Sequence, residues 1–268
     1  MLNGVISGIR SAGYNLIEPI NLRLLRIAWE YDYNLIHTPF DPLVSVYVPT
    51  FNRADLLIER SLKSIRAQTY KHFEVIVVAH GCTDDTVQRV HALGDKRIRV
   101  IEIPRTRTYP DRPENHWFAG RVAPANAGLA ACKGMYIATN DDDDVWTPSH
   151  IELLLRFAQR GDYEFVSARH DTHEGLIEPY DVDGVKVGGL QTWLYRSYLR
   201  EFKFNSQCWR KSWNSVCDTD LQDRFRKAGV RMGYLDKIVA HILLRPGENL
   251  IGLKAYREER TRQQMSFK

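Results

Sequence analysis

The sequence predicts an α/β fold: a mostly parallel sheet with flanking helices. Two observations support this fold class. Between residues 43 and 103, apolar segments of strand length alternate with segments of helical periodicity. Residues 73–79, FEVIVVA, form a continuous apolar run, which is typical of a strand buried on both faces of a parallel sheet. Because strand–helix–strand connections are right-handed crossovers, these strands are expected to be parallel neighbours.

The elements follow from apolar spacing and from turn residues. Strands are expected at residues 43–48, 73–79, 97–103 and 135–139. Helices are expected at residues 55–68, 86–93, 126–132, 148–159 and 221–227. Thr147 and Pro148 are expected to cap and start the fourth of these helices, and Gly229 to end the fifth. Residues 104–123 are expected to form a long functional loop, and residues 184–189 a glycine-rich turn.

Residues 1–42 are predicted to be a helical extension that precedes the main domain. Apolar residues recur there at near-helical spacing, namely Ile17, Ile20, Leu24, Leu25, Ala28 and Trp29. Two interpretations stay open. The helix either packs on the surface of its own domain, or it contacts a membrane surface or a second copy of the chain.

The composition limits the class of partner. The chain has 268 residues, with 37 Lys+Arg against 33 Asp+Glu and a formal charge of +4. This excess is too small to indicate nucleic acid, but it suits a phosphate-bearing substrate or an anionic membrane surface. The four cysteines show no zinc-type spacing and favour a reducing compartment. With no long apolar run and no signal-peptide pattern, we expect a cytoplasmic protein, either free or peripheral at the inner face of the membrane.

Four consecutive carboxylates, Asp141 to Asp144, follow the strand predicted at residues 135–139. Ligands of open parallel sheets bind beyond the carboxyl ends of the strands, so a binding site is expected here. Carboxylate oxygens suit Mg²⁺ or Mn²⁺, which also bind substrate phosphates. The alternative is a solvated acidic turn that stabilises the N-terminus of the next helix. The strand before the run and the proline-started helix after it favour the metal site.

Two blocks of the sequence resemble family 2 glycosyltransferases, which have the GT-A fold. The blocks are VSVYVPTFNRADLLIERSLKSIRAQTYKHFEVIVVAHGCTDDT and NAGLAACKGMYIATNDDDDVWTP. The resemblance is clear over residues 43–160 and weaker to about residue 245. It implies a Rossmann-like domain over residues 43–250, with a nucleotide-sugar-binding half at 43–146 and an acceptor and catalytic half at 147–250. Residues 251–268 are then a C-terminal tail.

The resemblance also implies an activity. A metal-dependent, inverting glycosyltransferase would move a sugar from a nucleotide-diphosphate donor, with UDP, GDP or dTDP, to a hydroxyl of a glycan or lipid-linked saccharide. Mn²⁺ or Mg²⁺ would be the cofactor. The implied metal ligands are Asp143, Asp144 and His241, although a lone histidine of this kind is more often structural. Asp142 falls on the position that the family lets vary. The residues implied to border the donor are Pro49, Thr50, Phe51, Asn52, Arg53, His80 and Asp141.

The chain departs from the family pattern at two places near the donor. Ala79 and His80 stand where acids usually read the nucleotide base, so uracil is less secure, and His80 is either the replacement reader or a turn residue. Ala125 stands where an arginine is common, and the missing charge could come from a residue of the preceding loop. The candidates are Arg105, Arg107 and Arg121.

The resemblance places a general base in DTDLQDRFRKAG. Aligning Leu221, Arg224 and Gly229 with the family pattern makes Asp218 the base that takes a proton from the acceptor hydroxyl, with Asp220 as its rival. Cys217 replaces the usual glutamate. Arg245 could reach the donor diphosphate.

The acceptor-side loop is implied to include Gly189, Gln191 and Trp193, and the alternative for Trp193 is a buried core position. Two other functions stay open. The pattern Asp141-x-Asp143-x-Val145 also fits an aspartate-nucleophile phosphohydrolase, and the departures above fit a GT-A module that binds donor without turnover.

Overall fold

The sheet and its helices are seen in a computed structural model, which describes residues 2–33, 40–106, 113–210 and 216–258. The strands are β1 Val44–Thr50, β2 Phe73–His80, β3 Ile98–Ile103, β4 Tyr136–Thr139, β5 Val145–Trp146, β6 Phe165–Thr172, β7 Gly175–Leu176, β8 Tyr180–Val182, β9 Val185–Val187, β10 Leu194–Arg196 and β11 Met232–Ile242. The α-helices are α1 Leu2–Tyr33, α2 Ala54–Leu56, α3 Lys63–Arg66, α4 Thr86–Ala92, α5 Pro113–Ala119, α6 Val122–Ala131, α7 His150–Arg160 and α8 Cys217–Ala228. A π-helical segment, Leu57–Leu62, joins α2 to α3, and short 3₁₀ turns cover Leu190–Thr192, Ser197–Phe202 and Cys208–Arg210.

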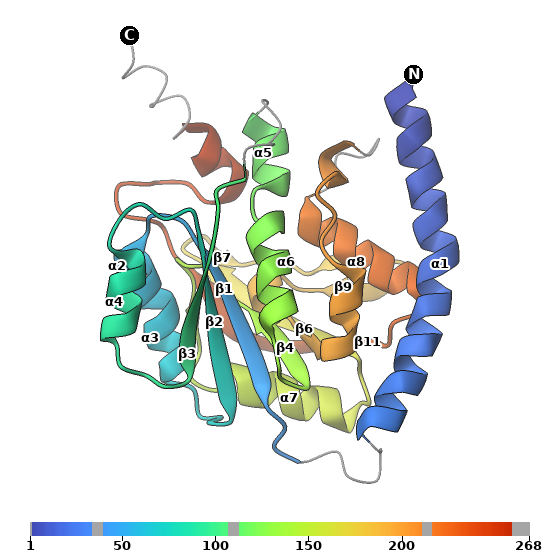
Figure 1. Cartoon of the computed structure of the whole chain (residues 1–268), viewed down its shortest axis with the longest axis horizontal. Coiled ribbons are helices and arrows are strands. Elements are labelled where there is room, and N and C mark those ends of the chain that lie inside the picture. The colour runs from blue at the N-terminus through green and yellow to red at the C-terminus, as the bar shows by residue number, and fades with distance from the viewer. Residues whose placement is uncertain (1, 34–39, 107–112, 211–215, 259–268) are drawn as a thin grey trace.

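Nine of the described strands form one mixed, mostly parallel sheet in the order β3-β2-β1-β4-β10-β6-β11-β5, with β7 paired to β6, and β8 and β9 form a separate two-stranded sheet (Figure 1). The first half is parallel throughout, because β1 pairs with both β2 and β4, and β2 with β3, in parallel register. In the second half β10 runs antiparallel between β4 and β6, and β11 runs parallel to β6. The predicted α/β fold class is confirmed.

Each helix that covers the sheet does so with an apolar face. In α7 the buried apolar residues are Ile151, Leu154, Leu155 and Ala158, which lie on one face of the helix, and the element packs on β6 and β11. Helix α6 packs on β1 and β2 through small and apolar residues. These helices leave the carboxyl ends of β1, β2 and β4 free of cover, which is where a ligand can enter.

Several predicted boundaries need correction. Helix α7 begins at His150 rather than Pro148, because the Pro148 carbonyl accepts the Thr69 N–H instead of joining the helix. Helix α8 begins at Cys217, four residues before the expected start, so both candidate aspartates lie in its first turn, where negative charge is favourable.

The two predicted loops also contain regular structure. Residues 104–123 include α5 and the start of α6, because Pro113 starts a helix there rather than breaking one. Residues 184–189 include β9, which pairs with β8 in a hairpin. Residues 252–258 of the expected C-terminal tail are helical.

Helix α1 packs on the body of the domain with one face. Leu22 and Trp29 are buried, and Trp29 meets Tyr198 edge-on at 5.1 Å between ring centroids. Arg26 donates two hydrogen bonds of 2.6 Å to the buried carboxylate of Glu164. Of the two interpretations, packing on the chain's own domain is therefore the one that describes the face with Leu22, Arg26 and Trp29. Within the described residues no helix combines the length and apolar character needed to cross a membrane.

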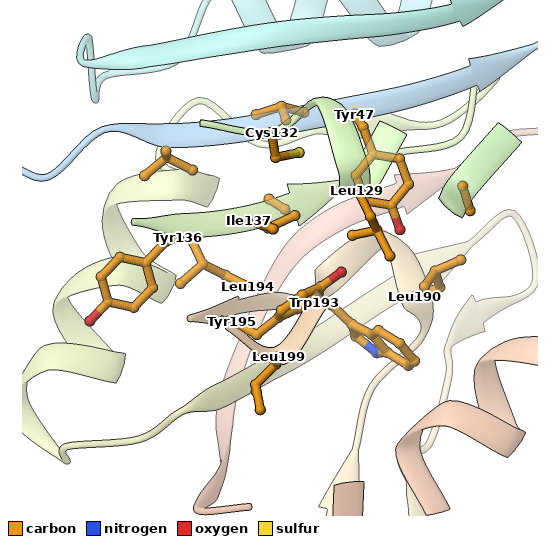
Figure 2. Packing of buried hydrophobic residues seen from close by; sticks show 14 of the residues in the cluster. Tyr47, Leu129, Cys132, Tyr136, Ile137, Leu190, Trp193, Leu194, Tyr195 and Leu199 are labelled. Carbon is orange, nitrogen blue, oxygen red and sulfur yellow. The ribbon is translucent and has the colours of Figure 1, made fainter. Parts of the chain in front are cut away.

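The core beside the neighbouring strands β4 and β10 is built from large side chains. Figure 2 shows Trp193 and Tyr195 packed with Leu190 and Leu199 beside Ile137. The Trp193 ring is 1% exposed and meets Phe165 at 5.1 Å between centroids. This core fixes the start of the acceptor-side segment against β4.

Candidate active site

A cavity of about 460 Å³ opens at the carboxyl ends of the parallel strands. Because β1, β2 and β4 are parallel, the residues that follow them meet at one edge of the sheet, as expected for an open α/β sheet. The predicted site residues that line this cavity are Pro49, Thr50, Phe51, Arg53, His80, Asp141, Asp143, Gly189, Gln191 and Asp218. The structure thus brings together donor, acceptor and base candidates that lie up to 169 residues apart in the chain.

Each of three aspartates in the acidic run has its own arginine. Asp141 Oδ1 lies 2.8 Å from Arg121, which comes from the segment before α6. Asp143 Oδ2 accepts a hydrogen bond of 2.5 Å from Arg245 Nε, beyond β11. The charges of the run are therefore balanced by cations from distant parts of the chain. Of the three loop arginines offered as replacements for the missing charge, Arg121 and Arg105 line the cavity, and Arg107 lies outside the described residues.

Asp142, which falls on the position that the family lets vary, is engaged on both oxygens in this chain. Thr50 Oγ1 donates to one oxygen at 2.9 Å and Arg53 to the other at 3.1 Å. Burial raises the pKa of Asp142 to about 6, against the opposing effect of Arg53. Asp142 therefore joins the end of β1 to the acidic run, and it lines the cavity as well. Only its position beside Asp141 and Asp143 could have indicated this role.

Asp144 does not line the cavity. Asp144 is only 4% exposed, and burial together with the neighbouring charge of Asp143 raises the pKa of its carboxyl group well above the ordinary value. Its backbone carbonyl accepts a hydrogen bond from Asn140 Nδ2, which closes the turn between β4 and β5. Asp144 supports the turn from behind the cavity rather than facing a ligand in it.

His80 lies at the end of β2 with its ring held in a fixed orientation. Its Nε2 accepts the backbone N–H of Thr106 at 3.0 Å, so the proton of the neutral ring is on Nδ1. Burial and the nearby Arg105 lower the pKa of His80 to about 4, so the ring is neutral near pH 7. Gly81 follows with φ +68°, and a Cβ there would meet Arg105 at 2.8 Å. His80 therefore lines the cavity as a neutral ring that is held by Thr106.

The first loop borders the cavity through Phe51, over which the Arg105 guanidinium lies at 3.8 Å from the ring centroid. Asn52, in contrast, does not line the cavity. Its side-chain amide exchanges two hydrogen bonds with Thr83, at 2.9 and 2.8 Å. Asn52 therefore ties the first loop to the second.

The two candidate bases on α8 occupy different environments. Asp218 lines the cavity and is half-buried, and its Oδ1 accepts the Thr219 N–H at 2.7 Å. Burial raises the pKa of Asp218, although Thr219 and Arg121 act in the opposite direction. Asp220 is 1% exposed and faces Arg224 inside the fold, with 3.6 Å between the charged groups. Of the two, Asp218 is the one positioned to meet a ligand.

The predicted acceptor side contains two buried side-chain nitrogens that have no hydrogen-bond partner among the described residues. These atoms are Gln191 Nε2 and His170 Nδ1, and both residues line the cavity. They meet over Gly189, where a Cβ would come within 2.9 Å of each side chain. His170 is a residue that the sequence did not indicate, because nothing in HDTHEG marks a site. Polar atoms of this kind can receive sugar hydroxyls.

The placement of Trp193 corrects its inclusion among the acceptor-side residues. Its ring is buried in the core, and its indole N–H donates to the Gly188 carbonyl at 2.9 Å. No sugar could reach the ring without opening the core. Trp193 therefore occupies the buried core position, which was the alternative left open by the sequence.

The placement of His241 does not support its inclusion among the metal ligands. Its Nδ1 lies 2.5 Å from Asp171 Oδ1, and it does not line the cavity beside Asp143. The expected tail contributes instead, because Gly252 and Tyr256 line the cavity. No motif in residues 251–258 could have shown this.

The donor set can be tested against a divalent cation. Within the described residues, no three His, Cys, Asp or Glu side chains are arranged to hold a metal ion on their own. Mg²⁺ and Mn²⁺ are commonly held by one or two carboxylates together with water and substrate phosphates. Asp141 and Asp143 both face the cavity, and the Asp141 side chain is 44% exposed. These two carboxylates fit such a cation in the presence of a diphosphate.

The family can now be identified from sequence comparison. The sequence model described as Glycosyl transferase family 2 matches residues 45–212, well over half of the chain. The chain belongs to glycosyl transferase family 2. The matched range includes the acidic run, Asp141 to Asp144. It ends before α8, so Asp218 lies outside it.

Individual relatives agree with this family. WfaP of Escherichia coli, a UDP-Glc:alpha-D-GlcNAc-diphosphoundecaprenol beta-1,3-glucosyltransferase, is 25% identical over 195 residues, covering 73% of this chain and 66% of the relative. The chain spans 34% and 39% of the lengths of two curated relatives that match it at 35% identity.

Two solved structures share the fold. TarS 1-349 of S. aureus in complex with UDP-GlcNAc has a TM-score of 0.58 at 20% identity, with 79% of this chain and 60% of that chain covered. The mannosyltransferase PcManGT from Pyrobaculum calidifontis, in complex with GDP-Man and Mn²⁺, has a TM-score of 0.55 at 15% identity, with 97% and 76% covered. At these identities the likeness shows the GT-A type of fold alone.

Proposed function

We propose that this chain catalyses the inverting transfer of a sugar from a nucleotide-diphosphate donor to a hydroxyl of a saccharide or lipid-linked acceptor. One observation carries the proposal. The arginine-balanced acidic run, with Asp141 and Asp143, and the carboxylate of Asp218 line one cavity from opposite halves of the domain. A sugar held between them would have its leaving group on one side and an incoming hydroxyl on the other.

The donor half suits a diphosphate with a nucleoside. Arg53 and Arg245 line the cavity beside the acidic run, and guanidinium groups bind phosphate oxygens well. His80, a neutral ring that lines the cavity at the end of β2, would contact the base. The relatives leave the base open, since one was solved with UDP-GlcNAc and another with GDP-Man.

Asp143, with Asp141, would hold Mn²⁺ or Mg²⁺ against the donor diphosphate. When bound, the cation neutralises the charge that develops on the leaving diphosphate. A relative of the same fold was solved with Mn²⁺, which supports the choice of ion. Asp144 and His241 are not included in this ligand pair, because neither lines the cavity.

Asp218 would remove the proton from the acceptor hydroxyl. The Thr219 N–H donates to one of its carboxylate oxygens, Oδ1, and the residue lines the cavity. As the hydroxyl oxygen attacks the anomeric carbon, its proton passes to Asp218 and the bond to the diphosphate breaks on the opposite face. Gln191 Nε2 and His170 Nδ1 would hold hydroxyl groups of the acceptor. The acceptor named for WfaP, a diphosphoundecaprenol-linked GlcNAc, supports a lipid-linked acceptor.

A product assay tests the proposal against the two other functions. A panel of UDP-, GDP- and dTDP-sugars is incubated with the protein and Mn²⁺. We expect nucleoside diphosphate to be released, and to be released faster with an added acceptor than with water alone. Donor binding without release would favour a binding module. Hydrolysis of a simple phosphate ester without any nucleotide-sugar turnover would favour a phosphohydrolase, although membership of family 2 gives that reading no support.

A further inference from the structure

The outward face of α1 carries a continuous apolar stripe. Five residues recur with alternating spacings of three and four, and their exposed fractions are high: Ile17 57%, Ile20 60%, Leu24 61%, Ile27 63% and Tyr31 88%. This spacing is that of the a and d positions of a coiled coil. Exposed apolar residues placed singly need no explanation, but a contiguous stripe of this length marks an interaction surface.

The helix cannot turn this stripe inward, because its other face is fixed to the body. Leu22 and Trp29, which lie opposite the stripe at the f positions of the heptad, are buried. Arg26 is paired with Glu164, and the buried Arg224 of α8 donates to Glu18. Figure 1 shows α1 along one edge of the molecule, with its outer side away from the sheet. The stripe is therefore held in place for a partner outside this chain.

We propose that α1 pairs in antiparallel orientation with α1 of a second copy of this chain. A two-fold axis between Leu24 and Ile27 would place Leu24 against the partner's Ile27. The same axis would place Ile20 against the partner's Tyr31. Each contact occurs twice, as a two-fold interface requires. The proposal does not depend on the proposed function, since no α1 residue lines the cavity.

Charges beside the stripe select this orientation. Arg23 and Glu30 occupy successive g positions and are both exposed. In the antiparallel pair Arg23 lies beside the partner's Glu30, so two ion pairs flank the apolar contacts. A parallel pair would place Arg23 beside Ala28, which carries no charge. The observed charges therefore complement one another only across the antiparallel interface.

The same charges argue against a membrane as the occupant. Helices that lie on an anionic bilayer carry lysine and arginine along the border of the apolar face. Here the exposed border of the stripe carries one arginine and one glutamate, which cancel. A second copy of the chain matches this border, whereas a lipid surface does not.

Sedimentation velocity of the whole chain in low salt, over a range of protein concentrations, tests the pairing. Wild type is expected to dimerise, and the variant with both Leu24→Glu and Ile27→Glu to stay monomeric at every concentration. Those side chains point outward, so circular dichroism and the melting temperature should show a folded protein. Lys96→Glu, on an exposed loop of the body, is the matched charge control and should leave the dimer unchanged.

Charge reversal tests the orientation. Arg23→Glu alone and Glu30→Arg alone should each weaken dimerisation by about tenfold, because two attractive pairs become repulsive. The double reversal should restore wild-type affinity. A dimer that ignores the Leu24 and Ile27 changes, or a double reversal that restores nothing, would overturn the proposal. So would a wild-type chain that stays monomeric, whether or not it sediments with vesicles containing anionic lipid.

Discussion

Three of the four carboxylates at 141–144 are paired with arginines from three other segments. Two carboxylates about 4 Å apart repel by roughly 4 kcal/mol at an effective dielectric constant near 20. Arg121, Arg53 and Arg245 offset this repulsion at Asp141, Asp142 and Asp143 in turn. The fourth, Asp144, is buried, and its pKa is raised well above the ordinary value. Under the proposed function, a diphosphate with its cation would take over these existing partners.

At this scale the sharpest prediction concerns Asp218. Asp218→Asn keeps the size and the Thr219 contact but cannot accept a proton, so turnover should fall by about 10²- to 10⁴-fold. Donor affinity should change little. Initial rates and calorimetric donor binding check both parts. Asp223→Asn is the matched control on the same helix, because that side chain pairs with Lys227 away from the cavity.

The pH profile of turnover provides a second check on Asp218. Because the folded pKa is raised, the acidic limb of the kcat/KM profile should lie above the ordinary aspartate value of about 3.9. Rates should be full above that limb and fall as the carboxylate becomes protonated. An acidic limb at or below the ordinary aspartate range would argue against Asp218 as the base.

Among the elements, α7 carries a buried histidine that makes folding sensitive to pH. His150 stacks on Trp146 at 3.7 Å between centroids and donates from Nδ1 to the Val239 carbonyl. Burial lowers the pKa of His150 to about 3, while the bond to Val239 opposes the shift. The unfolded side chain titrates near pH 6.5. Its stabilising effect is therefore complete above about pH 6.5 and is lost as the pH falls toward 3.

His150→Phe tests this account. Between pH 4 and 6 the free energy of unfolding of the wild type should rise with pH more steeply than that of the variant, by about 1.4 kcal/mol per pH unit. The reason is that unfolding of the wild type takes up one proton at residue 150, whereas unfolding of the variant does not. At pH 7 the variant should be less stable by about 1 kcal/mol, because the bond to Val239 is lost. Urea titrations at several pH values measure both. Equal slopes for the two proteins would contradict the assignment.

Element by element, the sequence predicted what is periodic and missed what depends on tertiary contacts. The strands at 73–79 and 97–103 follow from their own apolar patterns and agree closely with β2 and β3. The start of α8 does not, since Cys217 to Asp220 look polar and loop-like in isolation. At the site, Asp141, Asp143 and Asp218 were indicated by resemblance, and all three reach the cavity. His170 and Tyr256 were not, because only the fold brings them there.

For the whole molecule, α1 is integrated with the body although the sequence suggested a separable extension. Removing residues 1–42 would expose Trp29's packing site and leave Arg224 without Glu18 and Glu164 without Arg26. Breaking a buried ion pair from one side costs about 3–5 kcal/mol. The truncated chain should therefore have a lower melting temperature than the full chain, and a free energy of unfolding that is lower by at least about 3 kcal/mol.

Calorimetry and thermal unfolding of the truncated chain measure this effect. Arg26→Met in the full chain is the milder companion, since it removes one of these pairs while keeping the helix. A truncated chain with unchanged unfolding free energy would show that α1 only lies on the surface. The cavity should keep its donor affinity in any truncated protein that stays folded, because α1 contributes no lining residue.

We propose that the cavity as a whole binds a nucleotide-diphosphate sugar with a divalent cation, and one titration tests this most directly. Isothermal calorimetry with UDP-, GDP- and dTDP-sugars, in Mn²⁺ and in EDTA, is performed on wild type and on Asp143→Asn. The account predicts that one nucleotide class binds to wild type in Mn²⁺, and that EDTA or the substitution removes most of the affinity. Binding of equal strength in all of these conditions, or no binding of any nucleotide sugar to the wild-type chain, would contradict it.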